Sequence, residues 1–542
     1  MKFNKTKLFA PVVALSLTMT TTTSCVNDLD VEPINPQTTM EMDADALFNK
    51  RYASYCLTGQ TGASGNGDLA DIDEGRSEFF RMLWYLNEFT ADEAHWVWAT
   101  DAGVPELLHN TFGADNIFST GLYYRLYFTI TLCNFYLDQV NGGDDETLMR
   151  RAEVRFIRAM QYFHIMDIFG NAAFTEKVSA ELAQYYTRDQ FYAYVESELK
   201  ACEGDLAEPG QNTYGRIDKV AAWNLLSRLY LNAEVYTGAP QWELAKQYAE
   251  AVIKNGHYAL WTGNATNPVT GEEYSAYQML FLADNDVNGA QKEIIFPAIY
   301  HGINTTNYGG TNFLIFSTYS PAMDANVPSG TDCSWGKCTR VRPQLLEKFY
   351  GNVDNAPAGK TVAEMTTAAN DDRALLYGDG FTPLIEDEGD QAAGYACVKF
   401  RNVRSDGEST SSIAYVDTDL PIFRVAEAYL TCAEAITRMN NGVATADATP
   451  YIDQLRDRAH ANKQNLYSLD DICNEWSREF WFEGRRRMDL VRFGKYAGQG
   501  AYKWQWMGGE VGGRQFASHM NIYAIPANDL TNNSNLKQND GY

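Results

Sequence analysis

Five consecutive segments in the first half of the chain carry apolar residues at spacings of three and four, and this pattern constrains the fold more than any other feature. The segments are 122–139, 146–169, 188–206, 218–236 and 241–255. Such spacing gives a helix one apolar face, and the breaks between segments contain Gly or Pro and are mostly short. Because helices joined by short turns lie antiparallel, the sequence predicts stacked helical hairpins.

One pair of segments is similar to a degenerate tetratricopeptide repeat. AAWNLLSRLYL at 221–231 is followed by ELAKQYAEAVI at 243–253, and the small residues Ala245 and Ala249 fall where the two helices would approach most closely. The spacing of the other pairs is irregular. We therefore describe region 122–255 as tetratricopeptide-like rather than as a regular repeat array.

A second helical block is predicted near the C-terminus, over 421–495. Its segments are 421–440, 450–462 and 469–492. The middle segment has a clear start signal, because Thr449 can cap the first amides and Pro450 suits the first helical position.

The residues between the two helical blocks, 257–415, are rich in Gly, Asn, Thr and Ser. Short apolar runs such as EIIFPAIY and CVKFRNVR predict a few short strands there. Long irregular segments on a rigid scaffold are the usual place for binding residues. Together these patterns predict a mostly α fold: one domain over 41–542, built from tetratricopeptide-like helical hairpins with a long loop-rich insertion that carries a few short strands.

The N-terminus has the pattern of a bacterial lipoprotein signal. Three lysines precede an apolar run over 8–19 that is too short to span a bilayer, and small polar residues lead to Cys25. We expect residues 1–24 to be removed, the thiol of Cys25 to be acylated, and 25–40 to form a tether. The alternative is a secreted protein with a cysteine near its cleavage site.

The charge balance excludes one class of partner. The chain has 44 Lys and Arg against 70 Asp and Glu, which gives a net charge of -26. A surface this negative repels nucleic acid, because nucleic-acid binders need a basic footprint. Aromatic residues make up 13% of the chain, and aromatic rings are what a neutral sugar packs against.

No pattern in the sequence predicts catalysis or zinc binding. The G-x-S-x-G, H-E-x-x-H, phosphate-loop and C-x2-C motifs are absent. Asp92 and Glu93 lie near two tryptophans, but a glycosidase needs carboxyl groups about 5 to 10 Å apart across the scissile bond. Adjacent residues of an extended segment point in opposite directions. Arg485, Arg486 and Arg487 lie among acidic residues, so we expect them to pair within the scaffold rather than bind phosphate.

Several motifs resemble those of the SusD/RagB family of outer-membrane nutrient-binding lipoproteins. The likeness is most specific in EWSREFWFEGRRRMDLVRFGK and in the closing IPANDLTNNSNLKQNDGY, and NEFTADEAHWVW, RRAEVRFIRAMQYF, NYGG, DDRALLY and DTDLPIFRVAEAYL fall in family order. The resemblance covers nearly the whole mature chain. It implies a lipid-anchored protein on the exterior of the outer membrane, a glycan site on the loop face, and a TonB-dependent transporter of the SusC type as partner.

Resemblance to the starch-binding member of this family also implies the site residues. Trp98, Tyr308 and Trp335 match sugar-stacking positions and would form an aromatic arc. The other residues expected at this site are Asp73, Arg81, Asp101 and Trp96. From the sequence alone each tryptophan of HWVW would be placed in the core, because large aromatic residues are usually buried. Asp101 departs from the starch-binding member, which has Asn there.

Two acidic segments suggest a cation site. DND at 284–286 and DTD at 417–419 offer the hard oxygen ligands that Ca²⁺ prefers, although such segments also occur as solvated turns. The resemblance favours Asp286, Asp417 and Asp419 as ligands of a structural calcium ion. No catalytic cofactor is expected.

These observations predict a cell-surface glycan-binding lipoprotein, not an enzyme, that captures starch or malto-oligosaccharides and delivers them to a SusC-type transporter. Three alternatives stay open. The chain could bind a different neutral glycan such as a β-glucan, it could be a lipoprotein glycosidase, or it could be a structural lid with no ligand of its own.

Overall fold

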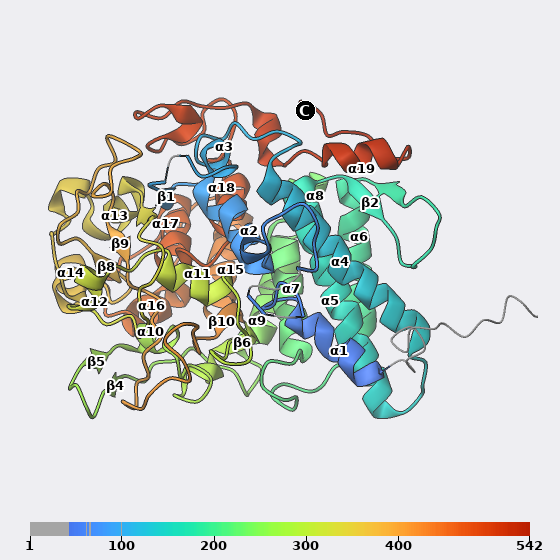
Figure 1. Ribbon diagram of the computed structural model, residues 1–542, viewed down its shortest axis with the longest axis horizontal. Coiled ribbons are helices and arrows are strands. Elements are labelled where there is room, and N and C mark those ends of the chain that lie inside the picture. The colour runs from blue at the N-terminus through green and yellow to red at the C-terminus, as the bar shows by residue number, and fades with distance from the viewer. Residues whose placement is uncertain (1–42, 61, 64–66, 99) are drawn as a thin grey trace, which may run out of the picture. The chain divides into compact units, whose positions relative to one another are not determined.

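The structure is a computed structural model (Figure 1), and it describes residues 43–60, 62–63, 67–98 and 100–542. Within it, Ala44–Tyr542 forms one compact unit. The predicted signal peptide, the acylated Cys25 and the tether lie outside the described residues. Among the residues that are described, none of the helices has the length and apolar character needed to cross a membrane.

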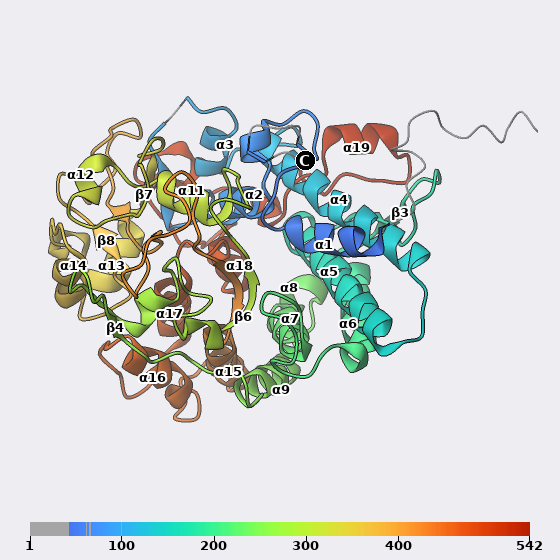
Figure 2. The same ribbon diagram turned by 60° about the horizontal axis from the view of Figure 1, so that its bottom comes forward.

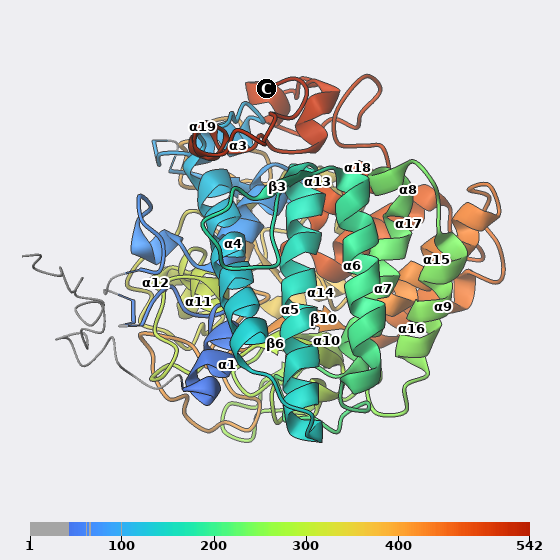
Figure 3. The same ribbon diagram turned by 90° about the vertical axis from the view of Figure 1, so that its right-hand side faces the viewer.

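The predicted helices of the first half are present and stand side by side in Figure 3. They are α4 (Ile117–Gln139), α5 (Asp145–Phe169), α6 (Arg188–Cys202), α7 (Lys219–Leu231), the short α8 (Ala233–Thr237) and α9 (Trp242–Ile253). Asn116, Asp144 and Asp218 cap α4, α5 and α7 by accepting hydrogen bonds from amides of the first turn. Each long helix packs against the next, which confirms the prediction of helical hairpins.

Helix α9 connects the two helical blocks. Ala245 and Ala249 are fully buried on it, and α9 packs closely against both α7 and α15 (Ala426–Met439). Small side chains let neighbouring helix backbones approach, because little side-chain volume lies between them. The predicted close contact in the tetratricopeptide-like pair is therefore present, and the late helix α15 shares it.

The predicted C-terminal block is helical except at its start. Its helices are α15, α16 (Thr449–Arg458), α17 (Leu469–Phe480) and α18 (Arg486–Arg492). The prediction of helix from residue 421 is wrong, because β10 (Leu420–Arg424) is a strand that pairs antiparallel with β6 (Ile294–Ala298).

Two further details of this block differ from the prediction. The expected helix 469–492 is broken between α17 and α18, where Phe482 and Gly484 have φ of 63° and 74°. A right-handed helix does not continue through such angles. Thr449 does not cap α16, because its hydroxyl donates to the carbonyl of Thr445 at 3.1 Å.

The loop-rich region between the blocks contains short helices as well as the predicted short strands. The helices are α10 (Ala276–Met279), α11 (Gly310–Phe316), α12 (Pro321–Asp324), α13 (Pro343–Tyr350) and α14 (Val362–Ala369). Its strands besides β6 are β4 (Ala265–Thr266), β5 (Glu273–Tyr274), β7 (Thr339–Val341), β8 (Leu376–Tyr377) and β9 (Ala396–Cys397). Figures 1 and 2 show α11 to α14 on the opposite side of the unit from α5 and α6.

The remaining elements precede α4, connect α5 to α6, or follow α18 in the sequence. They are α1 (Ala44–Ala53), α2 (Phe79–Trp84), β1 (Ala94–Trp96), α3 (Val104–Leu108), β2 (Ala172–Phe174), β3 (Gln184–Tyr186) and α19 (Ala527–Asn532). Strand β1 pairs with β7, and β2 pairs with β3.

A buried network of charged side chains surrounds Glu479 of α17. Its carboxylate accepts hydrogen bonds from Arg424 at 2.6 Å and Arg373 at 3.2 Å, and it also pairs with Arg458. All four side chains are buried. Burial alone would raise the pKa of Glu479, but the three guanidinium groups outweigh it and lower the pKa. The network therefore requires Glu479 in its charged form.

The basic run of the C-terminal motif pairs inside the scaffold. Arg485 donates to Asp489 at 3.0 Å, and Arg486 donates to Asp92 at 2.7 Å. Arg487 lies over two tyrosine rings instead. The prediction of pairing within the scaffold is confirmed for the first two arginines, and all three are buried.

Candidate functional site

Segments far apart in the sequence meet at one end of α11. The pairing of β1 with β7 extends past the strands, where the amide of Val97 donates to the carbonyl of Cys338 at 2.9 Å. The amide of Cys338 donates in turn to the carbonyl of Ser317, directly after α11, at 2.7 Å. These bonds bring the segment with Trp98 and the loop with Trp335 to the same place.

Trp335 and Tyr308 form part of the predicted arc. The ring of Trp335 stacks on Phe316 of α11, with centroids 5.2 Å apart and planes inclined by 4°. Tyr308 meets Trp335 edge-on, at 6.0 Å and 89°. Gly336 has φ of 100°, and a β carbon there would lie 1.6 Å from the carbonyl oxygen of Phe316. Only glycine lets the loop approach α11 this closely.

Trp98 is exposed and rests on a buried tryptophan. Its side chain is 41% exposed, and its ring meets that of Trp96 at 5.5 Å and 79°. Trp96 is only 1% exposed, and its ring lies 6.1 Å from Phe313 of α11. This burial contradicts the prediction that Trp96 contacts a glycan. Although Trp96 and Trp98 are only two residues apart, the ring of Trp96 lies in the core and that of Trp98 lies at the surface. Trp96 is a core residue that supports Trp98.

Arg81 also lies beneath the surface, in α2. Its side chain is 7% exposed, and its guanidinium donates to the carbonyls of Gly75 at 2.9 Å and Tyr308 at 2.8 Å and to the hydroxyl of Tyr85. These bonds direct most of the guanidinium donors at the protein, and the role of Arg81 in binding sugar hydroxyls stays a prediction. Arg81 positions the segment that carries Tyr308.

Asp73 and Asp101 lie at the edge of the aromatic cluster. A β carbon on Gly75 would lie 3.3 Å from Oδ1 of Asp73 and 2.9 Å from Cδ2 of Tyr308, so Asp73 lies beside that ring. Asp101 accepts a hydrogen bond from Arg76 at 2.7 Å. Our sequence reasoning missed Arg76, because no local motif connects it to a partner 25 residues away.

We call this surface the aromatic face, and its members are Trp98, Tyr308 and Trp335 with Asp73, Arg76 and Asp101 at the edge. It offers ring faces and charged hydrogen-bonding groups. An uncharged ligand with apolar CH faces and many hydroxyl groups fits this chemistry.

The predicted calcium ligands lie in neighbouring loops. Asp417 accepts hydrogen bonds from two backbone amides, whereas Asp419 is buried and Asp286 is exposed. Burial raises the pKa of Asp419 to about 8, and the other two carboxylates add to the rise. No group of three His, Cys, Asp or Glu side chains is gathered as a metal site in the part of the chain that the structure describes. The three carboxylates are therefore near enough to interact but do not surround one point.

Asp92 and Glu93 belong to the core. Asp92 accepts from Lys348 at 2.7 Å and pairs with Arg486, and Glu93 pairs with Ser477. Both carboxylates are buried. They therefore have a structural role and supply no acid and base to the aromatic face.

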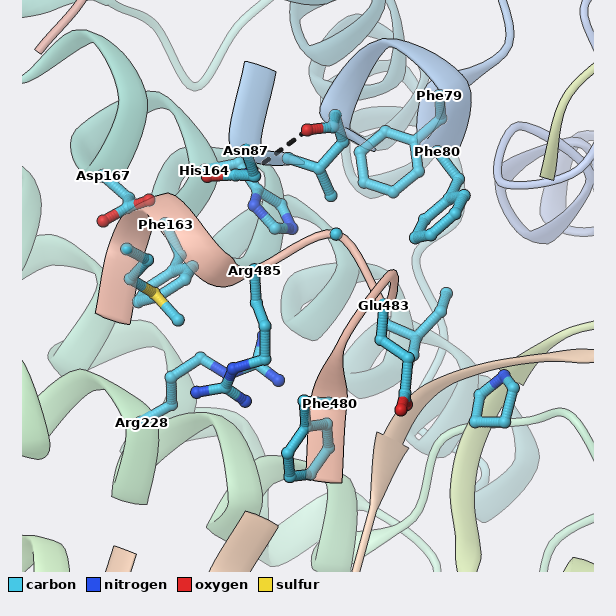
Figure 4. Close-up of a pocket in the computed structure, with 15 residues that line it drawn as sticks. Phe79, Phe80, Asn87, Phe163, His164, Asp167, Arg228, Phe480, Glu483 and Arg485 are labelled. Carbon is cyan, nitrogen blue, oxygen red and sulfur yellow. Dashed lines mark hydrogen bonds between the residues drawn. The ribbon is translucent and has the colours of Figure 1, made fainter. Parts of the chain in front are cut away.

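An internal cavity of about 50 Å³ lies between α5 and the segment after α17, apart from the aromatic face. Figure 4 shows the side chains that line it, among them His164 and Asn87. Within the described chain, Nε2 of His164 and Oδ1 of Asn87 have no hydrogen-bond partner. Burial lowers the pKa of His164 to about 3, so the imidazole is neutral. The cavity has room for a few water molecules and is far smaller than the roughly 300 to 1,000 Å³ of ligand pockets.

Two regions of the chain match known families. Residues 358–542 match the SusD family, and residues 29–231 match a family described as "Starch-binding associating with outer membrane". The chain is 40% identical to the starch-binding protein SusD of Bacteroides thetaiotaomicron, over 96% of each protein. It is also 23% identical to a SusD-like protein of Bacteroides ovatus, over 70% of this chain and 66% of that protein.

Solved structures share the fold. A laminarin-binding SusD-like protein superimposes with a TM-score of 0.65 at 19% identity, covering 93% of this chain and 99% of that one. Surface glycan-binding protein A from Bacteroides thetaiotaomicron, in complex with laminarihexaose, gives a TM-score of 0.64 at 20% identity, covering 92% and 98%. These similarities confirm the mostly α architecture. Together with the 40% identity over almost the whole length, they show that the chain belongs to the SusD/RagB family.

Proposed function

We propose that this protein is a cell-surface lipoprotein that binds starch or malto-oligosaccharides and passes them to a TonB-dependent transporter of the SusC type. The observation that carries the proposal is the aromatic face. The segment with the exposed Trp98 and the loop with Trp335 meet at the C-terminal end of α11, and Tyr308, which precedes α11, reaches the edge of the Trp335 ring. These rings belong to a chain that is 40% identical to a starch-binding protein.

The ring geometry favours a helical glucan. The ring planes of Tyr308 and Trp335 are inclined to each other by 89°, so one flat ligand cannot stack on both rings. A coiled α-1,4-glucan turns its sugar rings from unit to unit, whereas a β-1,4 chain keeps them in one plane. The net charge of -26 also disfavours anionic polysaccharides. A laminarin-type β-glucan is the second candidate, because two structural neighbours are named for such ligands.

The family description places these proteins at the outer membrane. To this we add an acylated Cys25 that holds the protein on the exterior face, supported by the signal pattern in the sequence. Cells labelled with a clickable palmitate analogue test the anchor: the wild-type protein should carry the label, and label retained by Cys25→Ala would contradict acylation at this residue.

Binding without hydrolysis distinguishes the proposal from the enzyme and lid alternatives. We expect the purified protein to be retarded in a native gel that contains amylopectin and to release no reducing sugar from it. Release of reducing sugar would indicate a glycosidase, and unchanged mobility with every glycan tested would indicate a lid. Albumin in the neighbouring lane controls for sieving by the polysaccharide.

A structural calcium ion is proposed at the loops of Asp286, Asp417 and Asp419. The other two carboxylates repel that of Asp419, and a divalent cation bound among them would relieve this repulsion. A ligand that binds only the folded state adds RT ln(1 + [L]/Kd) to stability. We expect EDTA to lower the melting temperature and Ca²⁺ to restore it, with no such response in Asp417→Asn. An unchanged melting temperature in EDTA, with no metal in elemental analysis, would contradict the site.

A further inference from the structure

A groove of about 220 Å³ lies between residues 69–72, the first turns of α4 and the start of α19. Figures 1 and 3 show α19 above the N-terminal end of α4, with α3 nearby. The volume is below the roughly 300 to 1,000 Å³ of sites that enclose a whole ligand. A groove of this size can hold one part of a longer ligand, while the rest of that ligand lies outside the groove.

Both walls of the groove continue into the aromatic face. Asp71 and Ile72 form one wall and directly precede Asp73. On the other wall, Cγ1 of Ile117 lies 2.7 Å from where a β carbon of Gly103 would be, two residues after Asp101. Consecutive Cα atoms are about 3.8 Å apart, so the Cα atom of Asp71 lies within about 8 Å of that of Asp73. Gly103, which contacts Ile117 of the groove, lies equally close to Asp101 along the chain.

The groove has the same chemical character as the aromatic face. Tyr124 contributes a half-buried ring, and Ile117 beside it is 38% exposed. Asp71, Asp115 and Asn528 make no side-chain hydrogen bond within the described chain, so their polar atoms are available to a ligand. A ring, apolar side chains and unpaired oxygen and amide groups match the CH faces and hydroxyl groups of a neutral sugar.

The backbone at Asp71 has an unusual conformation. Asp71 has φ of 63°, in the left-handed region that few residues other than glycine adopt. Its carboxylate, with that of Asp529, contributes to a raised pKa of Tyr124, after burial of the phenol. Asp71 and Tyr124 are therefore close to each other across the groove.

We propose that this groove is an extension subsite, which holds the continuation of the same glucan chain beyond the aromatic face. The inference rests on the proposed function, because it assumes a glucan at the aromatic face. A chain that reaches the groove gains contacts with Tyr124, Asp71 and Asn528, whereas a chain too short to reach it gains none. The subsite therefore makes affinity increase with chain length.

Calorimetric titration of malto-oligosaccharides of increasing length, from maltotriose to long amylose, tests this subsite. Tyr124→Ala should weaken binding of the long chains about three- to tenfold through loss of a ring contact, and Asp71→Ala should do so by a similar factor through loss of hydrogen bonds to sugar hydroxyls. Both variants should bind maltotriose as the wild type does. Tyr124→Phe should keep most of the affinity because it keeps the ring. Tyr429→Ala, which removes a half-buried tyrosine of α15, is the matched control and should match the wild type at every length.

The outcomes separate this inference from the function on which it rests. If the wild type binds no malto-oligosaccharide, the proposed function fails. If Trp98→Ala weakens all lengths while Tyr124→Ala and Asp71→Ala weaken none, the aromatic face stands and the extension subsite is overturned. Equal weakening of maltotriose and amylose by Tyr124→Ala would also overturn it. Thermal melting of each variant shows that the fold is intact.

Discussion

Replacing Trp98 by alanine should weaken binding of maltoheptaose at least tenfold with little loss of stability. The exposed 41% of the side chain corresponds to about 100 Å² of a ring that buries up to roughly 250 Å², and covering it at roughly 25 cal/mol per Å² contributes about 2.5 kcal/mol. Part of this is offset by ordering the ligand, so tenfold is the minimum expected. Isothermal titration calorimetry measures the effect.

Phe135→Ala is the matched control for this substitution. Phe135 is 40% exposed on α4, outside the aromatic face, and its removal should leave affinity unchanged. Trp335→Ala should behave like Trp98→Ala, although it also uncovers Phe316, on which Trp335 stacks. Wild-type affinity in both tryptophan variants, with unchanged circular dichroism, would show that the aromatic face is not the site.

The largest loss of stability is expected for Glu479→Ala. Three buried guanidinium groups, those of Arg373, Arg424 and Arg458, pair with this carboxylate. Removing one partner of a buried ion pair leaves uncompensated charge and costs about 3 to 5 kcal/mol. We expect a corresponding decrease in the free energy of unfolding measured in urea, or failure to accumulate as folded protein. Glu386→Ala, at an exposed glutamate, should have no effect.

The same network predicts a loss of stability in acid. Because the pKa of Glu479 is lowered from its ordinary value of 4.5, its contribution is fully present above about pH 4.5 and disappears as pH falls towards the folded-state pKa. The unfolding free energy of the wild type should therefore fall more steeply below pH 4.5 than that of Glu479→Ala. Parallel curves for the two proteins would contradict this assignment.

Long helices were predictable from the sequence, and short fully buried helices were not. The segments that became α4 to α9 are mostly long enough for apolar spacing to repeat over several turns, even in α5, where every residue from 156 to 169 is buried. Every residue of Gly310–Phe316 in α11 is buried, so its sequence GTNFLIF has no polar face to set a period. The same holds for Phe79–Trp84 in α2. Both helices are parts of the scaffold that holds the aromatic face.

The positions of the binding residues could not be predicted from local sequence pattern alone. Trp96 and Trp98 are two residues apart, yet one is buried on Phe313 and the other is exposed. This difference depends on where β1 leaves the core, which is set by its long-range pairing with β7. The contacts of Arg81 could not be predicted for a related reason, since one of its bonding partners is the backbone of Tyr308, 227 residues away. Arg76 and the groove beside Tyr124 had no sequence signal at all.

Calorimetric titration of the wild-type protein with maltoheptaose, a cyclodextrin and cellohexaose tests the central claim most directly. The perpendicular rings of Tyr308 and Trp335 predict binding of maltoheptaose and the cyclodextrin, both of which curve, and at least tenfold weaker binding of the flat cellohexaose. Equal affinity for cellohexaose, or no heat with either α-1,4-glucan, would contradict the assignment of the aromatic face to starch.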